Sequence, residues 1–206
     1  MRHITEDGWL VIEDEVFNGS PKQAGSDNHA FVFERSKVRL IRCGFFANGA
    51  SEAIKGSRLS DLELIECYGT RGVEDFADFV ECHRVKFIRT KFPDPAPGEG
   101  PQDVTAKGGS SDFEFIDCPG LRKVVMGNYT VYDGNGYKSW LQFWPSTPKT
   151  KNFTFRGCGV PDVEGWWADG IHGECAPHIW PAIFTLIFFY VRSKMPETGV
   201  NAALVK

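Results

Sequence analysis

The sequence predicts an all-β fold, a single-stranded right-handed parallel β-helix (solenoid) of about six or seven coils. Three observations predict it: a six-residue phrase recurs along the chain, its inner positions are apolar, and its outer positions carry charges of alternating sign. Self-similarity at a period of about 20–50 residues is the signature of stacked repeats. The right hand follows from the usual chirality of parallel crossovers. We therefore expect residues 1–206 to form one continuous domain without a linker.

The phrase alternates apolar and charged residues and then adds a second apolar residue. Its copies are WLVIED (9–14), VRLIRC (38–43), LELIEC (62–67), VKFIRT (85–90), FEFIDC (113–118) and FTFRGC (153–158), with a weaker copy, FTLIFF, at 184–189. The copies end at 14, 43, 67, 90, 118, 158 and 189, so the separations are 29, 24, 23, 28, 40 and 31 residues. The shortest separations indicate the basic coil, and the longer ones indicate the same coil with a loop inserted.

The charges of the phrase change sign from copy to copy. The fifth position holds Glu13, Arg42, Glu66, Arg89 and Asp117, and the second position holds Arg39, Glu63, Lys86 and Glu114. Parallel strands about 4.8 Å apart place equivalent residues side by side, whereas a helix gives no reason for such long-range alternation. Opposite charges attract across neighbouring strands and like charges repel. The alternation therefore predicts parallel strands stacked in register.

The apolar positions of the phrase indicate a buried face and a corner. The first and third positions are apolar in each of the six main copies, as expected of a strand with one buried side. The fourth position holds Ile12, Ile41, Ile65, Ile88 and Ile116. Two consecutive apolar residues break the alternation, so we expect a corner between two short strands there. The 22 Gly and 12 Pro residues suit a chain with many turns.

Four of the six cysteines occupy the last position of the phrase. They are Cys43, Cys67, Cys118 and Cys158. We interpret them as an inward column of small buried thiols, because no CxxC motif indicates a zinc site. A disulfide between Cys43 and Cys67 is compatible with the distance between neighbouring strands, but their parallel side chains give it poor geometry.

Two loops and an end cap are expected to interrupt or close the stack. The segment FPDPAPGEGPQD (92–103) falls inside a 28-residue separation, and a second loop at about 119–137 falls inside the 40-residue separation. The apolar run IWPAIFTLIFFYV (179–191) overlaps the weak phrase, so 179–206 is expected to form the last coil or a C-terminal cap. A second copy of the chain covering a solenoid end is an alternative, which makes a homo-oligomer an expected partner.

Charge and hydropathy exclude two classes of partner. The formal net charge of −4, with both signs interspersed, argues against a nucleic-acid-binding protein, which needs a basic stripe. The 13-residue apolar run is shorter than an ordinary membrane-spanning helix. The start of the chain, MRHITEDGWL, shows no signal peptide. An extracellular or virion-associated location is favoured only through the resemblances described below.

Carboxylates occur at a fixed distance before the phrases. Fifteen residues before the phrase ends at 43, 67, 90 and 118 lie Asn28, Glu52, Asp75 and Asp103. Carboxylates gathered in one groove raise one another's pKa values or recruit a cation. Calcium is the natural candidate, with Glu52, Asp75 and Asp103 as its ligands. The alternative interpretation is that these residues cap the turns before each strand, where Asp and Asn are common.

One stretch of the chain resembles the pectate lyases. DVTAKGGSSDFEFIDCPGLRKVVMGN (103–128) has an Asp-led strand, a Gly-Ser turn, an alternating strand and a Lys before a short apolar strand, which is similar to the pectate lyase pattern. SEAIKGSRLSDLELIEC (51–67) resembles the preceding coil of that family. The motif covers about 26 residues, and Arg156 is a poor stand-in for the family's catalytic arginine.

The resemblance implies calcium-assisted β-elimination of an acidic polysaccharide. In that chemistry a cation neutralises the uronate carboxylate and acidifies the adjacent C–H, and a basic residue then removes the proton. The resemblance makes Lys123 the first candidate for the catalytic cation at the sugar, with Lys107 second. The alternative interpretation of both lysines is a solvated surface charge.

Two other functions use the same fold. Glycoside hydrolysis needs two carboxylates, which Asp75, Asp78 and Asp103 could supply, with His172 as a further candidate. A non-catalytic glycan-binding β-helix, such as a phage tail spike, fibre or adhesin module, needs exposed aromatic residues instead. Trp140 and Trp144 are the candidates for stacking on sugar rings, and core packing is their alternative role.

Overall fold

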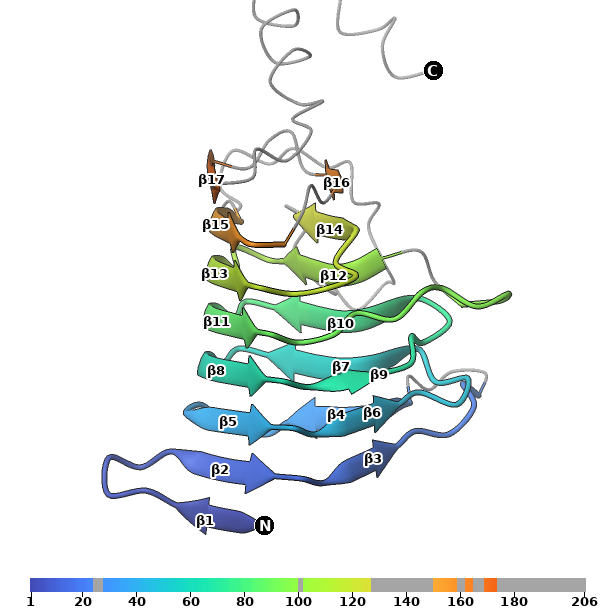
Figure 1. The fold of residues 1–206 in the computed structure, drawn as a ribbon, viewed down its shortest axis with the longest axis horizontal. Coiled ribbons are helices and arrows are strands. Elements are labelled where there is room, and N and C mark those ends of the chain that lie inside the picture. The colour runs from blue at the N-terminus through green and yellow to red at the C-terminus, as the bar shows by residue number, and fades with distance from the viewer. Residues whose placement is uncertain (24–27, 100–101, 127–149, 159–161, 165–168, 174–206) are drawn as a thin grey trace, which may run out of the picture.

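The computed structural model describes residues 1–23, 28–99, 102–126, 150–158, 162–164 and 169–173. Every regular element in this part of the chain is a strand, and the strands stack as about 4 turns of a parallel β-solenoid (Figure 1). The predicted all-β parallel solenoid is confirmed. The predicted count of six or seven coils is not confirmed, and the right hand of the coil stays a prediction.

Three sheets run along the stack. Sheet 1 contains, in spatial order, β1 (Arg2–Ile4), β2 (Leu10–Glu13), β5 (Val38–Ile41), β8 (Ser60–Ile65), β11 (His83–Ile88), β13 (Ser111–Ile116), β15 (Lys151–Arg156) and β17 (Asp169–Gly173). Sheet 2 contains β16 (Asp162–Glu164), β14 (Lys123–Met126), β12 (Gln102–Lys107), β10 (Asp75–Val80), β7 (Glu52–Ser57) and β4 (His29–Phe33). Sheet 3 contains β3 (Val16–Asn18), β6 (Gly44–Phe46) and β9 (Tyr68–Gly69). All neighbouring strands are parallel except β1 and β2.

The six phrases lie on successive strands of sheet 1, as predicted. Phe87 pairs with Phe115 and with Leu64, so equivalent letters of neighbouring phrases are in register. The first phrase is the exception, because Leu10 rather than Trp9 pairs with Val38. This one-residue slip keeps an apolar pair, Ile12 and Leu40, on the inner side. It also corrects the predicted charge column, which therefore begins with Asp14 instead of Glu13.

The charge column lies at a corner with left-handed backbone. The φ values in this column lie between 48° and 55°, and its residues are Asp14, Arg42, Glu66, Arg89 and Asp117. Positive φ is uncommon for residues other than glycine. The corner is held by the next coil: the Arg42 N–H donates to the carbonyl of Ile65 (2.8 Å), and the Glu66 N–H donates to that of Ile88 (2.8 Å). The predicted corner is therefore confirmed, and it explains why the charged side chains point outward.

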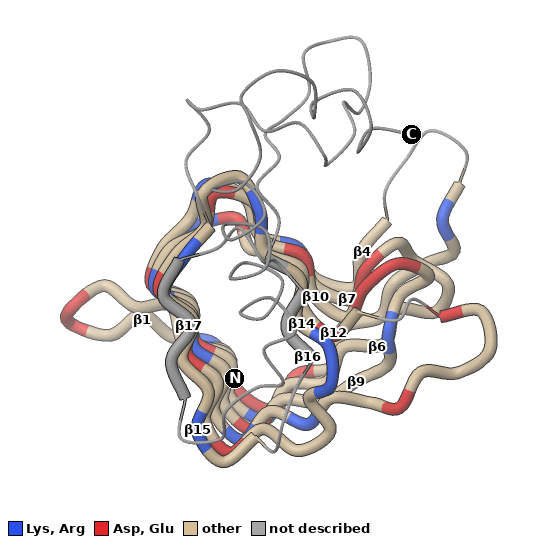
Figure 2. Tube along the Cα trace, turned by 90° about the horizontal axis from the view of Figure 1, so that it is seen from above, with Lys and Arg blue, Asp and Glu red and all other residues tan. Residues whose placement is uncertain are grey.

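Ion pairs join neighbouring coils at the corners. Arg42 Nε lies 2.7 Å from Asp14 Oδ1, and Arg89 Nε lies 2.9 Å from Glu66 Oε1. A second left-handed column, at the start of the sheet 1 strands, contains Lys37, Asp61, Arg84, Asp112 and Asn152. Figure 2, which looks along the stack, shows acidic and basic positions gathered together at these corners. The alternating signs in the sequence therefore correspond to ion pairs between neighbouring coils.

Aromatic side chains fill the interior in register. The rings of Phe87, Phe115 and Phe155 stack in sequence, with 5.0 Å between successive centroids and interplanar angles of 5° and 7°. Phe113 and Phe153 form a parallel pair at 4.7 Å. All five are fully buried. Such pairs add to the burial of apolar area, which is the main stabilising contribution of the core.

The cysteine column is buried, as predicted, and its thiols are free. Cys43, Cys67, Cys118 and Cys158 point inward, with Thr90 in the equivalent position of its coil. Each donates a hydrogen bond to a carbonyl of the preceding coil, as Cys118 Sγ does to Phe87 (3.3 Å) and Thr90 Oγ1 does to Leu64 (2.9 Å). The column therefore places small side chains in the interior and adds a hydrogen bond between neighbouring coils.

Core and strand residues occupy parts of both predicted loops. Phe92, the first residue of the predicted 92–103 loop, is buried against Phe76, and β12 already begins at Gln102. Between them, the described residues 93–99 leave the stack (Figure 1). Within the predicted 119–137 loop, residues 123–126 form β14. Residues 127–137, the weak phrase at 184–189 and the expected cap at 179–206 lie outside the described residues. The described part of the chain contains no helix that could span a membrane.

Removing the Phe115 side chain should be among the most damaging single substitutions. Phe115→Ala leaves a cavity between two stacked rings and should lower the free energy of unfolding by roughly 3–5 kcal/mol. Glu66→Arg reverses an exposed corner charge and should cost only about 1 kcal/mol. Urea unfolding followed by circular dichroism measures both values. A charge reversal costlier than the Phe truncation would contradict the burial assigned to these two columns.

Candidate functional site

The outer face of sheet 2 presents polar side chains in columns. In β7 the apolar Ala53 and Ile54 and the small Gly56 face the core, which leaves Glu52 and Lys55 on the outer side. Gly56 is required because a Cβ there would lie 2.8 Å from the Phe79 ring. β10 and β12 repeat the pattern of one outward, two inward and one outward residue. Equivalent outward residues of neighbouring strands therefore lie side by side, as Lys55 and Asp78 do.

The first column contains two of the three predicted calcium ligands. Glu52 pairs with Asp75 across β7 and β10, as expected from their equal distance to the phrase. The residue that follows in this column is Gln102, and His29 precedes Glu52. Asp103 and Asn28, which the fixed spacing predicted, are each displaced from the column by one residue.

Turn lengths between sheets 2 and 1 explain the displacement. Two residues separate β7 from β8 and β10 from β11, whereas three residues, 108–110, separate β12 from β13. The extra residue shifts every position of β12 by one relative to its phrase. Because the first residue of the pattern points outward and the second points inward, a slip of one residue moves a side chain from the outer to the inner side of the sheet. Gln102 thereby takes the outward position, and Asp103 points into the core.

Asp103 has a structural role in its buried position. Its Oδ1 is ion-paired with the Arg71 guanidinium, and both side chains are almost completely buried. Its Oδ2 accepts hydrogen bonds from the main-chain N–H groups of Arg122 (2.6 Å) and Lys123 (2.7 Å). Arg71 Nε also donates to the carbonyl of Pro93 (3.1 Å). Asp103 therefore links the chain before β10, β12 and the start of β14, and its lone pairs are engaged.

The three predicted calcium ligands are consequently not brought together. Glu52 and Asp75 share a column, while Asp103 is withdrawn into the interior. Within the described ranges, no group of three or more His, Cys, Asp or Glu side chains is arranged to hold a metal ion. Two neighbouring carboxylates supply fewer oxygen atoms than the six to eight that calcium prefers, and the calcium site stays a prediction.

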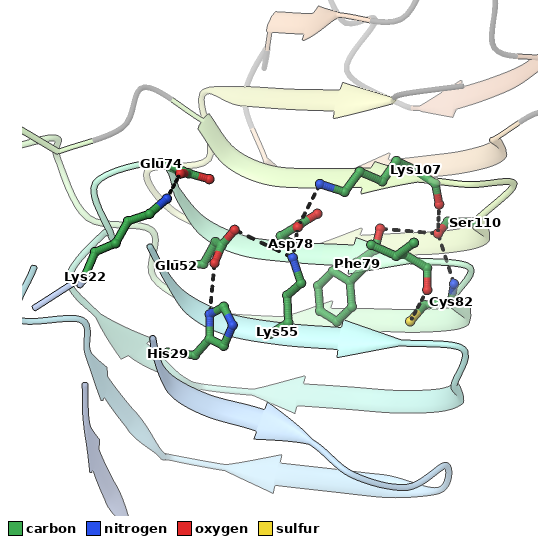
Figure 3. A network of polar contacts seen from close by, with 11 residues as sticks. Lys22, His29, Glu52, Lys55, Glu74, Asp78, Phe79, Cys82, Lys107 and Ser110 are labelled. Atoms are coloured by element: carbon green, nitrogen blue, oxygen red, sulfur yellow. Dashed lines mark hydrogen bonds and ion pairs between the residues drawn. The ribbon is translucent and has the colours of Figure 1, made fainter. Parts of the chain in front are cut away.

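A network of five ionisable side chains occupies this face instead (Figure 3). His29 Nδ1 lies 2.9 Å from Glu52 Oε2, and Lys55 Nζ lies 3.6 Å from Glu52 Oε1. Lys55 is also ion-paired with Asp78 Oδ2, which Lys107 Nζ contacts at 2.9 Å. Asp78 is fully buried, whereas the side chains of Lys55 and Lys107 are 21% and 13% exposed. We call this set the outer-face network.

Three buried polar atoms of the network have no hydrogen-bond partner within the part of the chain that the structure describes. They are His29 Nδ1, Glu52 Oε2 and Asp78 Oδ1. The first two face each other at 2.9 Å and become an ion pair when His29 is protonated. Asp78 Oδ1 has no donor among the described residues, because both lysines contact Oδ2. Buried polar atoms are almost always paired in folded proteins, so each such exception requires an explanation.

The network perturbs the ionisation of its neighbours. Burial raises the pKa of Asp75 to about 7, and the nearby negative charges of Asp78 and Glu52 act in the same direction. Thr105, whose hydroxyl bonds Asp75, partly opposes this shift. Burial acts to lower the pKa of Lys55, but the carboxylates of Asp78 and Glu52 outweigh it and raise this pKa. Lys55 is therefore a fixed cation, whereas Asp75 changes charge near neutral pH.

The other predicted site residues lie in different places. Lys107 belongs to the outer-face network, while Lys123 is a partly exposed residue at the start of β14. Trp140 and Trp144 lie outside the described residues. His172 is in β17 of sheet 1, away from the sheet 2 network in the topology, and Arg156 ends β15. The lyase-type assembly of Lys123 beside a carboxylate groove is therefore not observed in the described part.

Sequence reasoning missed Lys55 and His29 and singled out Asp78 only as a candidate carboxylate for glycoside hydrolysis. The signal that identifies them is the same one that identified sheet 1. Lys55 and Asp78 are 23 residues apart and opposite in sign, like Glu66 and Arg89. No comparison with protein-family models, curated proteins or solved structures gives a match.

Breaking the buried pair of Arg71 and Asp103 should be strongly destabilising. Asp103→Asn leaves the guanidinium buried without its counter-charge and should cost roughly 3–5 kcal/mol in free energy of unfolding. Arg71→Met should cost a similar amount, and the double variant should cost less than the sum of the two. Arg84→Met, which breaks an exposed pair with Asp61, serves as the control and should cost at most about 1 kcal/mol. Additive effects of the two core substitutions would show that the pair is not coupled.

Neutralising Asp75 should stabilise the protein above neutral pH. The folded-state pKa of about 7 exceeds the ordinary 3.8, so the folded protein binds more protons than the unfolded chain between these values. The contribution of Asp75 to stability is therefore lost as pH rises from about 4 to about 7, at roughly 1.4 kcal/mol per pKa unit. Asp75→Asn should remove this loss and be more stable than wild type at pH 8.

Denaturant unfolding at several pH values measures this effect. Asp61→Asn is the matched control, because the Arg84 guanidinium lowers the pKa of Asp61. Its substitution should therefore remove stability at neutral pH, the opposite sign to Asp75→Asn. Equal stability of Asp75→Asn and wild type at pH 8 would contradict the raised pKa.

Proposed function

We propose that the protein is a glycan-binding member of the pectate lyase-like β-helix group and that the outer face of sheet 2 binds the polysaccharide. The observation that carries the proposal is Asp78 Oδ1, a fully buried carboxylate oxygen without a donor among the described residues. An unsatisfied buried acceptor is costly. A hydroxyl group, of water or of a ligand, satisfies it by donating one hydrogen bond.

The shape of the face suits a polymer. His29, Glu52, Asp75 and Gln102 follow one another on four neighbouring strands. Three strand spacings of about 4.8 Å give a polar column about 14 Å long. A chain molecule lying along the stack meets a polar side chain on each of the four strands. This repetition supports a polysaccharide over a small ligand.

The ionisation states support binding over catalysis. Calcium-assisted elimination needs free carboxylates for the cation and a base that can take a proton. Lys55 is held as a cation, and Lys107 is engaged with Asp78. Asp103 is withdrawn from the face. The calcium-dependent lyase is therefore the less well-supported of the two predicted functions, and a direct assay separates it from binding.

The protein should bind a polysaccharide without cleaving it. Affinity electrophoresis against polygalacturonate, alginate, galactan, mannan and xylan measures binding. Absorbance near 235 nm, with and without calcium, detects the unsaturated products of a lyase. We expect retardation by at least one polymer and no rise in absorbance. Calcium-dependent product formation would overturn the binding-only proposal in favour of the lyase.

A matched pair of lysine variants locates the surface. Lys107→Gln removes an ammonium group from the outer-face network and should weaken binding by about tenfold. Lys86→Gln removes an equivalent lysine from sheet 1, where it lies 3.2 Å from Glu114, and should leave binding within about twofold of wild type. Thermal unfolding confirms that both variants are folded. Equal losses in the two variants would show that sheet 2 is not the binding surface.

A further inference from the structure

We infer that the polysaccharide is uncharged at its binding site and is recognised through hydroxyl groups that donate to Asp78 and Glu52. This inference rests on the proposed function and reverses the acidic ligand implied by the resemblance to pectate lyases. It is based on which cations and which hydrogen-bond acceptors of the outer-face network are already paired.

The cations of the network are engaged with its own carboxylates. Lys55 and Lys107 both contact Asp78 Oδ2, and Lys55 also lies near Glu52. The two permanent positive charges are therefore matched by two carboxylates within the same face. A uronate carboxylate could pair with a lysine only by competing with Asp78. That competition would leave a fully buried carboxylate without its counter-charge, which is strongly unfavourable.

The acceptors of the network, in contrast, have free capacity. Asp78 Oδ1 has no donor among the described residues, and Glu52 Oε2, which lies 2.9 Å from His29 Nδ1, can accept a further hydrogen bond through its second lone pair. A hydroxyl group donates one hydrogen bond and accepts others. It can therefore donate to Asp78 Oδ1 while its oxygen accepts from a lysine that keeps its contact with Oδ2. A carboxylate has no proton to donate.

Access to Asp78 requires a small movement of side chains. Asp78 is fully buried, whereas the two lysine side chains that contact it reach the surface. Lysine stems are long and flexible, and their ammonium groups can stay on Oδ2 while the stems shift. The formal net charge of −4 also disfavours an acidic polysaccharide, because it repels a polyanion before contact.

The test compares two polymers with one backbone. Polygalacturonate and its carboxyl-reduced, uncharged form share the same linkage, and affinity electrophoresis or calorimetry measures binding to each at 20 and 300 mM salt. We expect the reduced polymer to bind at least tenfold more tightly, with little dependence on salt. Tighter, salt-sensitive binding of polygalacturonate would overturn the inference and leave the proposed glycan-binding function standing. Binding of neither polymer, nor of the other polymers above, would overturn both.

The single substitution Asp78→Asn should reverse the preference for the reduced polymer over polygalacturonate. Asp78→Asn removes the charge that holds Lys55 and Lys107, so binding of the reduced polymer should fall about tenfold while binding of polygalacturonate should rise. A folding defect would lower both affinities together and is thereby distinguished. Asp61→Asn, at an exposed corner paired with Arg84, is the control and should change neither affinity. Loss of polygalacturonate binding in a folded Asp78→Asn variant would contradict the inference.

Discussion

The hydrogen bond between corner residues of successive coils is the interaction on which the rest of the structure depends. At each corner a charged residue adopts positive φ, a conformation that costs roughly 1–2 kcal/mol for a residue with a Cβ. Its N–H donates to the next coil, as Arg89 does to the carbonyl of Ile116 (2.8 Å). Aligning the corners fixes the register of every column between them. The Phe stack, the thiol column and the outer-face network all follow from that register.

The same alternation of charge has different consequences on the two sheets. At the corners of sheet 1 the side chains are largely solvated, and exposed ion pairs contribute little to stability. On sheet 2 Asp78 is buried beneath paired lysines, so its charge must be balanced locally. The corner pairs therefore favour correct register over incorrect register, because a slip of one residue separates the opposite charges. The buried pairs determine which chemical groups a ligand can bring to the face.

Sheet 1 was predictable because its strands repeat a phrase whose apolar letters are nearly unchanged. The register of β5, β8 and β11 follows directly from aligning those letters. The single slip, at Trp9, occurs where the first phrase has no preceding coil of the same kind and pairs instead with the antiparallel β1. The strands of sheet 2 have no repeated phrase, so their positions depended on counting residues back across turns of unequal length. Glu52 and Asp75 were located correctly, and Asp103 was not.

That one-residue difference in turn length also determines the character of the site. With a two-residue turn after β12, Asp103 would occupy the outward position, and the column would present three adjacent carboxylates. The three-residue turn places the amide of Gln102 there, where its nitrogen, in the orientation that pairs donor with acceptor, lies 2.9 Å from Asp75 Oδ1. A neutral donor beside Asp75 needs no cation to balance it, whereas a third carboxylate would. The turn therefore removes a ligand that calcium would need, and it supplies the core with the anion that Arg71 requires.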